Sequence, residues 1–203
     1  MRYAVCMALG YLFGAISPAA FFAKIKRIDL REHGSGNMGS TNTFLVIGKR
    51  HGVFVMLFDI AKAFAASRLA RRLFPELAQA GLLAGYAAVI GHIFPFYMRF
   101  KGGKGLAAFG GMILAVDQRI FCVLLTVGLG LIVLTSRSVT MPVSASLLFP
   151  MLLWLHTSSY ADLALALAAS LLILTAHREN IKKAFARADM PVKAYIKSKI
   201  FKI

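Results

Sequence analysis

The residues best suited to bind an anion form a glycine-rich stretch between His33 and Asn42. Glycines alternate there with small hydroxyl and amide residues, so backbone N–H groups can converge on one oxyanion while side chains add further donors. A helix that starts nearby would also favour phosphate. The stretch differs from nucleotide-binding fingerprints because its glycines follow an apolar run of membrane length rather than a strand. The pattern predicts a phosphate-binding loop, with a flexible polar loop as the alternative. The candidate residues are Gly34, Ser35, Gly36, Asn37, Gly39, Thr41 and Asn42.

A second glycine cluster runs from Lys101 to Gly105 and leads directly into an apolar segment. Its two lysines flank glycines whose backbone has no side chains to hinder close approach, which suits a second phosphate contact. A membrane-entry turn with topological lysines is the alternative. The candidate residues are Lys101, Gly102, Gly103, Lys104 and Gly105.

A third candidate pair, His177 and Asn180, follows the last apolar segment. The two residues are three apart, so on a helix they share one face. An interfacial polar role is the alternative. His92 and His156 lie within apolar runs, where a histidine more often packs between helices than binds a ligand. The scattered acids and histidines suggest neither a metal site nor a cofactor site.

The elements that position these residues are predicted to be membrane helices. The chain has 203 residues, of which 59% are hydrophobic and 16% charged, with a mean hydropathy of +0.71. This composition excludes a disordered chain and argues against a soluble nucleic-acid binder, despite a net charge of +16. A membrane helix needs roughly 20 apolar residues. We expect an all-α bundle of seven such helices, with six plus a re-entrant segment as the competitor. The expected segments are 3–23, 52–67, 81–98, 105–116, 120–136, 138–161 and 163–176.

Charge placement predicts the orientation of this bundle. With the N-terminus outside and the C-terminus cytoplasmic, 18 of the 24 Lys and Arg residues lie on the cytoplasmic side, as the positive-inside rule requires. All three candidate motifs then share that side. Asp59 and Lys62 interrupt an apolar segment at a spacing that allows a neutralising pair in the bundle interior. We expect one domain over residues 1–203, in which 182–203 form a basic cytoplasmic tail that either lies along anionic lipid or is solvated.

The motifs resemble those of a bacterial integral-membrane family, the acylphosphate:glycerol-3-phosphate acyltransferases. Residues 34–42, followed by Gly48-Lys49 and Asp59-x-x-Lys62, are similar to the first family signature. Gly91-His92-x-Phe94-Pro95, leading to 100–105, is similar to the second, and 177–181 to the third. The three motifs occur in the family's order and spacing over residues 9–185.

The resemblance implies an inner-membrane enzyme that transfers a fatty acyl group from acyl phosphate to glycerol 3-phosphate, with its active site at the cytoplasmic face. Its products would be lysophosphatidic acid and phosphate. Its other expected partners are membrane lipids. The oligomeric state stays open, with a monomer among the alternatives. On this reading the expected catalytic residues are Ser35, Lys104, His177 and Asn180. Either His177 or a substrate phosphate oxygen takes the proton of the attacking hydroxyl.

Two departures from the family pattern leave other functions open. Leu45 occupies a position where the family usually has arginine. Pro142 and Val143 interrupt a turn that tends to be serine-rich, although Thr140 keeps a hydroxyl and is retained as a substrate-binding candidate. The alternatives are a paralogue that acylates another acceptor or binds lipid phosphate, and a small transporter of a phosphorylated solute. The transporter is disfavoured because the motifs cluster at one surface rather than at the membrane midplane.

Overall fold

The computed structural model describes residues 1–186, and the secondary structure of these residues is entirely helical. This confirms the all-α prediction for that range; most of the expected basic tail lies outside it. The chain divides into two compact units, Met1–Gln118 and a second that begins at Arg119, although no shift in composition marks this boundary.

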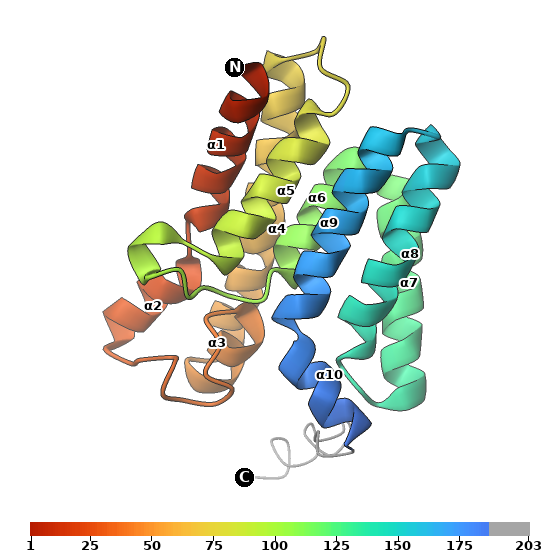
Figure 1. Ribbon diagram of the computed structural model, residues 1–203. Coiled ribbons are helices and arrows are strands. Elements are labelled where there is room, and N and C mark those ends of the chain that lie inside the picture. Colours follow the sequence, from red (N-terminus) through yellow and green to blue (C-terminus); the bar gives the residue numbers. More distant parts are fainter. Residues whose placement is uncertain (187–203) are drawn as a thin grey trace. The chain divides into compact units, whose positions relative to one another are not determined.

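The first unit contains one long α-helix, α4 (Lys49–Leu73), with α5 (Ala80–Ile93) and four other α-helices packed around it. Figure 1 shows α1 running beside α5, and α3 lying near the start of α4. Val55, Val89 and Phe109 are fully or almost fully buried among these helices. The other four are α1 (Arg2–Ala15), α2 (Pro18–Lys26), α3 (Ser40–Val46) and α6 (Leu106–Val116).

The first apolar segment forms one candidate membrane span, Arg2–Lys26, which agrees with the segment expected over 3–23, but its helix is interrupted at Ile16 and Ser17. α1 ends at Ala15, and α2 begins at Pro18. Proline lacks the N–H that would continue the hydrogen-bond ladder and disfavours a helical conformation in the preceding residue. Ser17 accordingly is extended, and its Oγ accepts a hydrogen bond from Ala20 N at 3.2 Å, which caps α2. The break leaves the Ile16 carbonyl available to another partner.

Glycines allow α1 and α5 to pack closely. A side chain on Gly10 would overlap the Ala84 carbonyl, and one on Gly14 would overlap the Ala88 carbonyl. Small residues four apart let helix backbones approach each other in membranes, where packing replaces much of the hydrophobic driving force. This close packing fixes the end of α5, from which the second glycine cluster follows.

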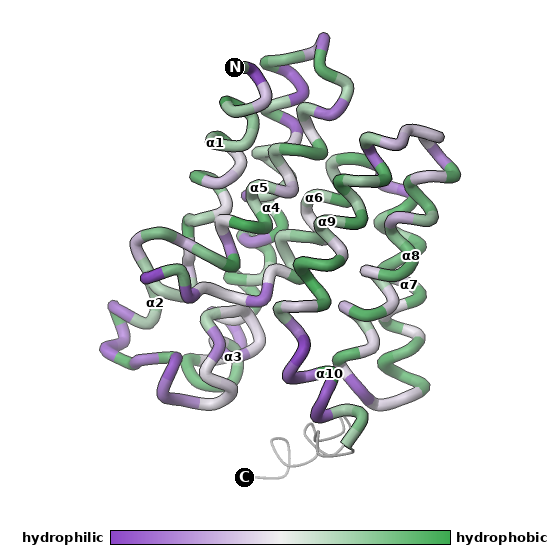
Figure 2. Tube along the Cα trace, viewed as in Figure 1, coloured by the Kyte–Doolittle hydropathy of each residue, from purple (hydrophilic) through white to green (hydrophobic). Residues whose placement is uncertain are grey.

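The second unit contains α7 (Gln118–Thr135), α8 (Thr140–Thr157), α9 (Tyr160–Ala176) and α10 (Arg178–Phe185). Figure 2 shows hydrophobic residues along α7 and α8 and hydrophilic residues along α10. The axes of α9 and α10 differ by 61°, and His177 lies at the bend.

Three helical segments of the described chain are long and apolar enough to cross a membrane, and a fourth qualifies if α9 and α10 count as one bent span. The three are Arg2–Lys26, Ala80–Met98 and Gln118–Thr135. α4 is longer than the predicted segment because it extends into flanking polar residues at both ends.

We predict that Gly14→Ala lowers the free energy of unfolding by about 1–3 kcal/mol, because the added methyl group would overlap the α5 backbone. Thermal unfolding in detergent measures the effect. Gly130→Ala, in α7, is the matched control: no described atom lies within 4 Å of the added methyl group, so the change should stay within about 0.5 kcal/mol. Equal melting temperatures for the two variants would contradict the packing account.

Candidate functional site

The first glycine segment is folded around one buried amide. Asn42 has no exposed surface; its Nδ2 donates to Leu30 O at 2.8 Å and to His33 O at 3.0 Å, and its Oδ1 accepts from Ser35 N at 2.8 Å. A side chain on Gly34 would overlap that Oδ1. The amide of Asn42 therefore shapes the loop from within, and direct contact of Asn42 with a substrate stays a prediction.

Backbone conformation and packing hold the rest of this loop. Gly34 and Gly36 have positive φ angles of 62° and 70°, a region that glycine adopts without strain. Leu30 and Met38, on either side of these glycines, are buried in a cluster with α2 and α4 residues. The loop is thus anchored at both ends by apolar side chains.

The predicted donors of this loop differ in exposure. Ser35 and Thr41 are exposed, and Asn37 is partly buried. Gly39 is buried at the start of α3, where its carbonyl accepts from both the N–H and the Oγ1 of Thr43 at 3.0 Å. The Ser35 and Thr41 side chains are therefore exposed on a loop whose backbone is held by hydrogen bonds.

The second glycine cluster leaves α5 through a short 3-10 turn, η1 (Phe96–Met98). Arg99 and Phe100 follow with positive φ angles of 55° and 57°, which are uncommon for residues with side chains. Gly102 N donates to Ile93 O at 2.9 Å, and Gly103 N donates to His92 O at 3.1 Å. These two glycine amides fasten the loop to the end of α5. The side chains of the exposed Lys101 and the partly buried Lys104, together with the start of α6 at Gly105, stay the predicted phosphate contacts.

Arg31 connects the two glycine segments. Its Nη2 donates to Lys101 O at 3.2 Å and to Met98 O at 3.3 Å, and its backbone N–H donates to Asp29 Oδ1 at 2.9 Å. Sequence reasoning missed this residue, since Arg31 lies in a basic stretch that the positive-inside rule already accounts for. The segment before the first loop thereby supports the second one.

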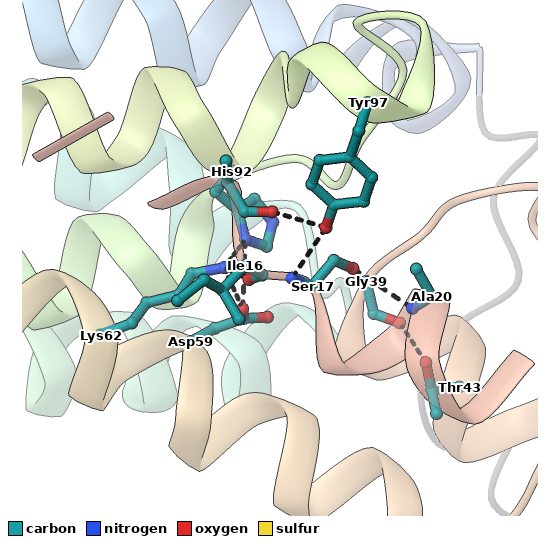
Figure 3. Close-up of polar contacts among 10 residues, drawn as sticks. Ile16, Ser17, Ala20, Gly39, Thr43, Asp59, Lys62, His92 and Tyr97 are labelled. Carbon is teal, nitrogen blue, oxygen red and sulfur yellow. Dashed lines mark hydrogen bonds and ion pairs between the residues drawn. The ribbon is translucent and has the colours of Figure 1, made fainter. Parts of the chain in front are cut away.

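A buried polar cluster joins α4, α5 and the break between α1 and α2 (Figure 3). Lys62 Nζ is 2.7 Å from Asp59 Oδ1 and donates to Ile16 O at 2.7 Å. His92 Nδ1 is 3.1 Å from Lys62 Nζ and 3.2 Å from Asp59 Oδ1. The predicted pairing of Asp59 with Lys62 is confirmed. The involvement of His92 and of the helix break at Ile16 was not visible in the spacing of the sequence.

The remaining site candidates belong to the second unit. His177 is buried, its Nδ1 lies 2.9 Å from Ile173 O, and Asn180 is partly buried one turn further on in α10. Thr140, at the start of α8, donates through Oγ1 to Arg137 O at 2.8 Å. Arg137 in turn donates to the Ala184 carbonyl of α10. The hydrogen bonds fix both the bend at His177 and the turn before α8.

In chemical terms, the first unit presents two fixed backbone turns with hydroxyl, amide and lysine side chains. Such groups bind and stabilise phosphate oxyanions by hydrogen bonds and charge. Among residues 1–186, no three His, Cys, Asp or Glu side chains lie together as metal ligands.

Comparison with known proteins agrees with this chemistry. A family model described as glycerol-3-phosphate acyltransferase matches residues 4–187. A glycerol-3-phosphate acyltransferase of Macrococcus caseolyticus is 36% identical over 190 residues, which cover 90% of this chain and 93% of that protein. The enzyme of the same name from Bacillus subtilis is 35% identical over 201 residues, covering 95% and 99%.

Solved structures give the same result. The crystal structure of PlsY (YgiH), an integral membrane glycerol 3-phosphate acyltransferase, in its glycerol 3-phosphate form is 30% identical, with a TM-score of 0.87 over 94% of this chain and 96% of that one. Its lysophosphatidic acid form has a TM-score of 0.85 at 29% identity. This chain has the fold of that membrane enzyme and belongs to the glycerol-3-phosphate acyltransferase family.

Proposed function

We propose that this protein transfers a fatty acyl group from acyl phosphate to glycerol 3-phosphate and releases lysophosphatidic acid and inorganic phosphate. The observation that carries the proposal is the match, over nearly the whole chain, to a structure in its glycerol 3-phosphate form. The two fixed glycine segments support it, because donor and acceptor each carry a phosphate group.

The proposed chemistry needs no covalent enzyme intermediate. Acyl phosphate is a mixed anhydride and already activated, so positioning and charge stabilisation can supply most of the catalysis. The acceptor hydroxyl oxygen bonds to the acyl carbon, the bond from that carbon to the phosphate oxygen breaks, and the hydroxyl proton passes to His177 or to a phosphate oxygen. Ser35 and its loop bind the donor's phosphoryl group, and Lys104 and Asn180 orient the acceptor.

We further propose a seven-span topology in the inner membrane, with the N-terminus outside and the active site at the cytoplasmic face. The distribution of positive charge supports this orientation, since 18 of 24 Lys and Arg residues then face the cytoplasm. The helices that fall short of a full span by length and composition, such as α6, count as crossings in this proposal.

Leu45 favours a second candidate, the acylation of a different acceptor. This residue lies on α3 and is partly buried, while the nearest downstream bases, Lys49 and Arg50, are exposed at the start of α4. An arginine at position 45 would add a charge-assisted contact worth roughly 1.5–3 kcal/mol to a bound phosphate. Because Leu45 offers no such contact, an acceptor other than glycerol 3-phosphate is the second candidate.

We predict that the purified protein in detergent consumes acyl phosphate only when glycerol 3-phosphate is present and forms one lysophosphatidic acid for each phosphate released. Phosphate assay and mass spectrometry of the lipid measure the two products. Acylation of another acceptor from a panel of polyols and polyol phosphates, without lysophosphatidic acid, would establish the second candidate instead. No turnover with any acceptor would contradict the acyltransferase assignment.

The same assay on three variants tests whether the activity belongs to the proposed site. Ser35→Ala, Lys104→Ala and His177→Ala should each lower kcat/KM by about a hundredfold or more. His177→Ala also distinguishes the two proton acceptors, since a pH–rate profile unchanged in shape would assign the proton to a phosphate oxygen. Unaltered turnover in all three variants would refute the site assignment.

We predict that Leu45→Arg lowers the KM for glycerol 3-phosphate by about tenfold to a hundredfold, the equivalent of a new charge-assisted hydrogen bond. Steady-state kinetics at saturating acyl phosphate provide the measurement. Phe44→Arg adds the same charge to the exposed neighbouring position of α3 and serves as the control. An unchanged KM in Leu45→Arg would mean that the acceptor phosphate does not lie near α3.

A further inference from the structure

The ammonium group of Lys62 has three N–H donors, and three acceptors surround it. These are Ile16 O and Asp59 Oδ1, both at 2.7 Å, and His92 Nδ1 at 3.1 Å. Lys62 and Asp59 are only 5% and 2% exposed, so water does not compete for these contacts. Each donor of the ammonium group is therefore matched with one acceptor.

This arrangement favours one tautomer of the His92 imidazole. A neutral imidazole has one N–H and one acceptor nitrogen. If Nδ1 accepts from Lys62, the proton lies on Nε2. The opposite tautomer would let Nδ1 donate to Asp59 Oδ1 at 3.2 Å, but that N–H would then face the ammonium group of Lys62, donor against donor. Lys62 Nζ would then have two acceptors for its three N–H donors, so the contacts around it favour the Nε2–H tautomer.

The opposite edge of the same ring lies against the second glycine cluster. A side chain on Gly103 would overlap His92 Nε2, and Gly103 N donates to His92 O. Within residues 1–186, the hydrogen bonds of the His92 side chain all involve Nδ1. The ring thus fills the space beside Gly103, with its Nε2 edge toward the loop and its Nδ1 edge toward Lys62.

The loop needs such support because its backbone is strained. Arg99 and Phe100 have positive φ angles, and backbone of this kind persists only where its surroundings hold it. A buried ion pair, in contrast, usually gives little net stability compared with an apolar pair of similar size. The presence of a buried Asp59–Lys62 pair is therefore better explained by its holding neighbouring groups in one geometry than by a contribution to the free energy of unfolding.

We propose that Asp59 and Lys62 are positioning residues for the acceptor site: they hold His92 in the Nε2–H tautomer and in one orientation, and the ring holds the Gly102–Lys104 segment in the conformation that receives the phosphate of glycerol 3-phosphate. The assignment of the acceptor rests on the proposed function. The assignment of the tautomer does not, so the two can fail separately.

Kinetics test the positioning role. His92→Gln should raise the KM for glycerol 3-phosphate by on the order of tenfold to a hundredfold, because a small displacement of binding groups is costly, while the KM for acyl phosphate changes less than threefold. His156→Gln, an exposed histidine at the end of α8, is the matched control and should leave both constants unchanged. An unchanged KM for glycerol 3-phosphate in folded His92→Gln, or an equal rise in both constants, would overturn the proposal.

Nitrogen NMR of histidine-labelled protein tests the tautomer without any activity. The His92 signal, assigned by its loss in His92→Gln, should report a protonated Nε2 and an unprotonated Nδ1. In Lys62→Met the ammonium donor is gone, so Nδ1 should become protonated and donate to Asp59. A protonated Nδ1 in the wild type, or the same tautomer in both proteins, would overturn the proposal. If Lys62→Met fails to fold, the wild-type signal decides: a protonated Nε2 supports the proposal, and a protonated Nδ1 overturns it.

Discussion

The arrangement around the second glycine segment depends on one buried cation. The Lys62 ammonium group donates a hydrogen bond to the Ile16 carbonyl, which the helix break leaves without a helical partner. It also forms an ion pair with Asp59 and contacts the ring of His92. These partners come from the α1–α2 junction, from α4 and from α5, so a single ammonium group ties three parts of the first unit together (Figure 3). Charges in such an apolar setting are tolerated only when paired and hydrogen-bonded, which makes the geometry of the cluster highly specific.

A second buried polar group, the amide of Asn42, plays the corresponding part in the first glycine segment. It satisfies two carbonyls and one N–H of the loop, which leaves the exposed hydroxyl of Ser35 on a rigid base. Arg31 then joins this region to the second segment. Phosphate binding favours such an arrangement, because donors that are fixed before the ligand arrives lose little entropy when they bind it.

Much of this could be predicted from the sequence, and the misses have physical causes. The lengths of the apolar runs predicted the helical fold class, and the spacing of Asp59 and Lys62 predicted their ion pair. Both predictions succeed because they depend only on residues close together in the sequence. The break at Pro18 was overlooked because hydropathy does not register the lost N–H. Arg31 contacts a residue 67 positions away, and His92 contacts residues 30 and 33 positions away. A single sequence contains no signal for contacts over such separations. The family motifs identified the two glycine segments but not the side chains that hold them in place, such as Arg31 and His92.

The central claim is that buried side chains fix the second glycine segment in a conformation that binds the acceptor phosphate. Isothermal titration of the purified protein with glycerol 3-phosphate, without acyl phosphate, tests it most directly when wild type is compared with His92→Gln. The substitution removes the ring that lies against Gly103 and contacts Lys62 and Asp59. The account predicts saturable binding by the wild type and at least tenfold weaker binding by the variant under conditions where both remain folded. Equal affinity of the two folded proteins would contradict it.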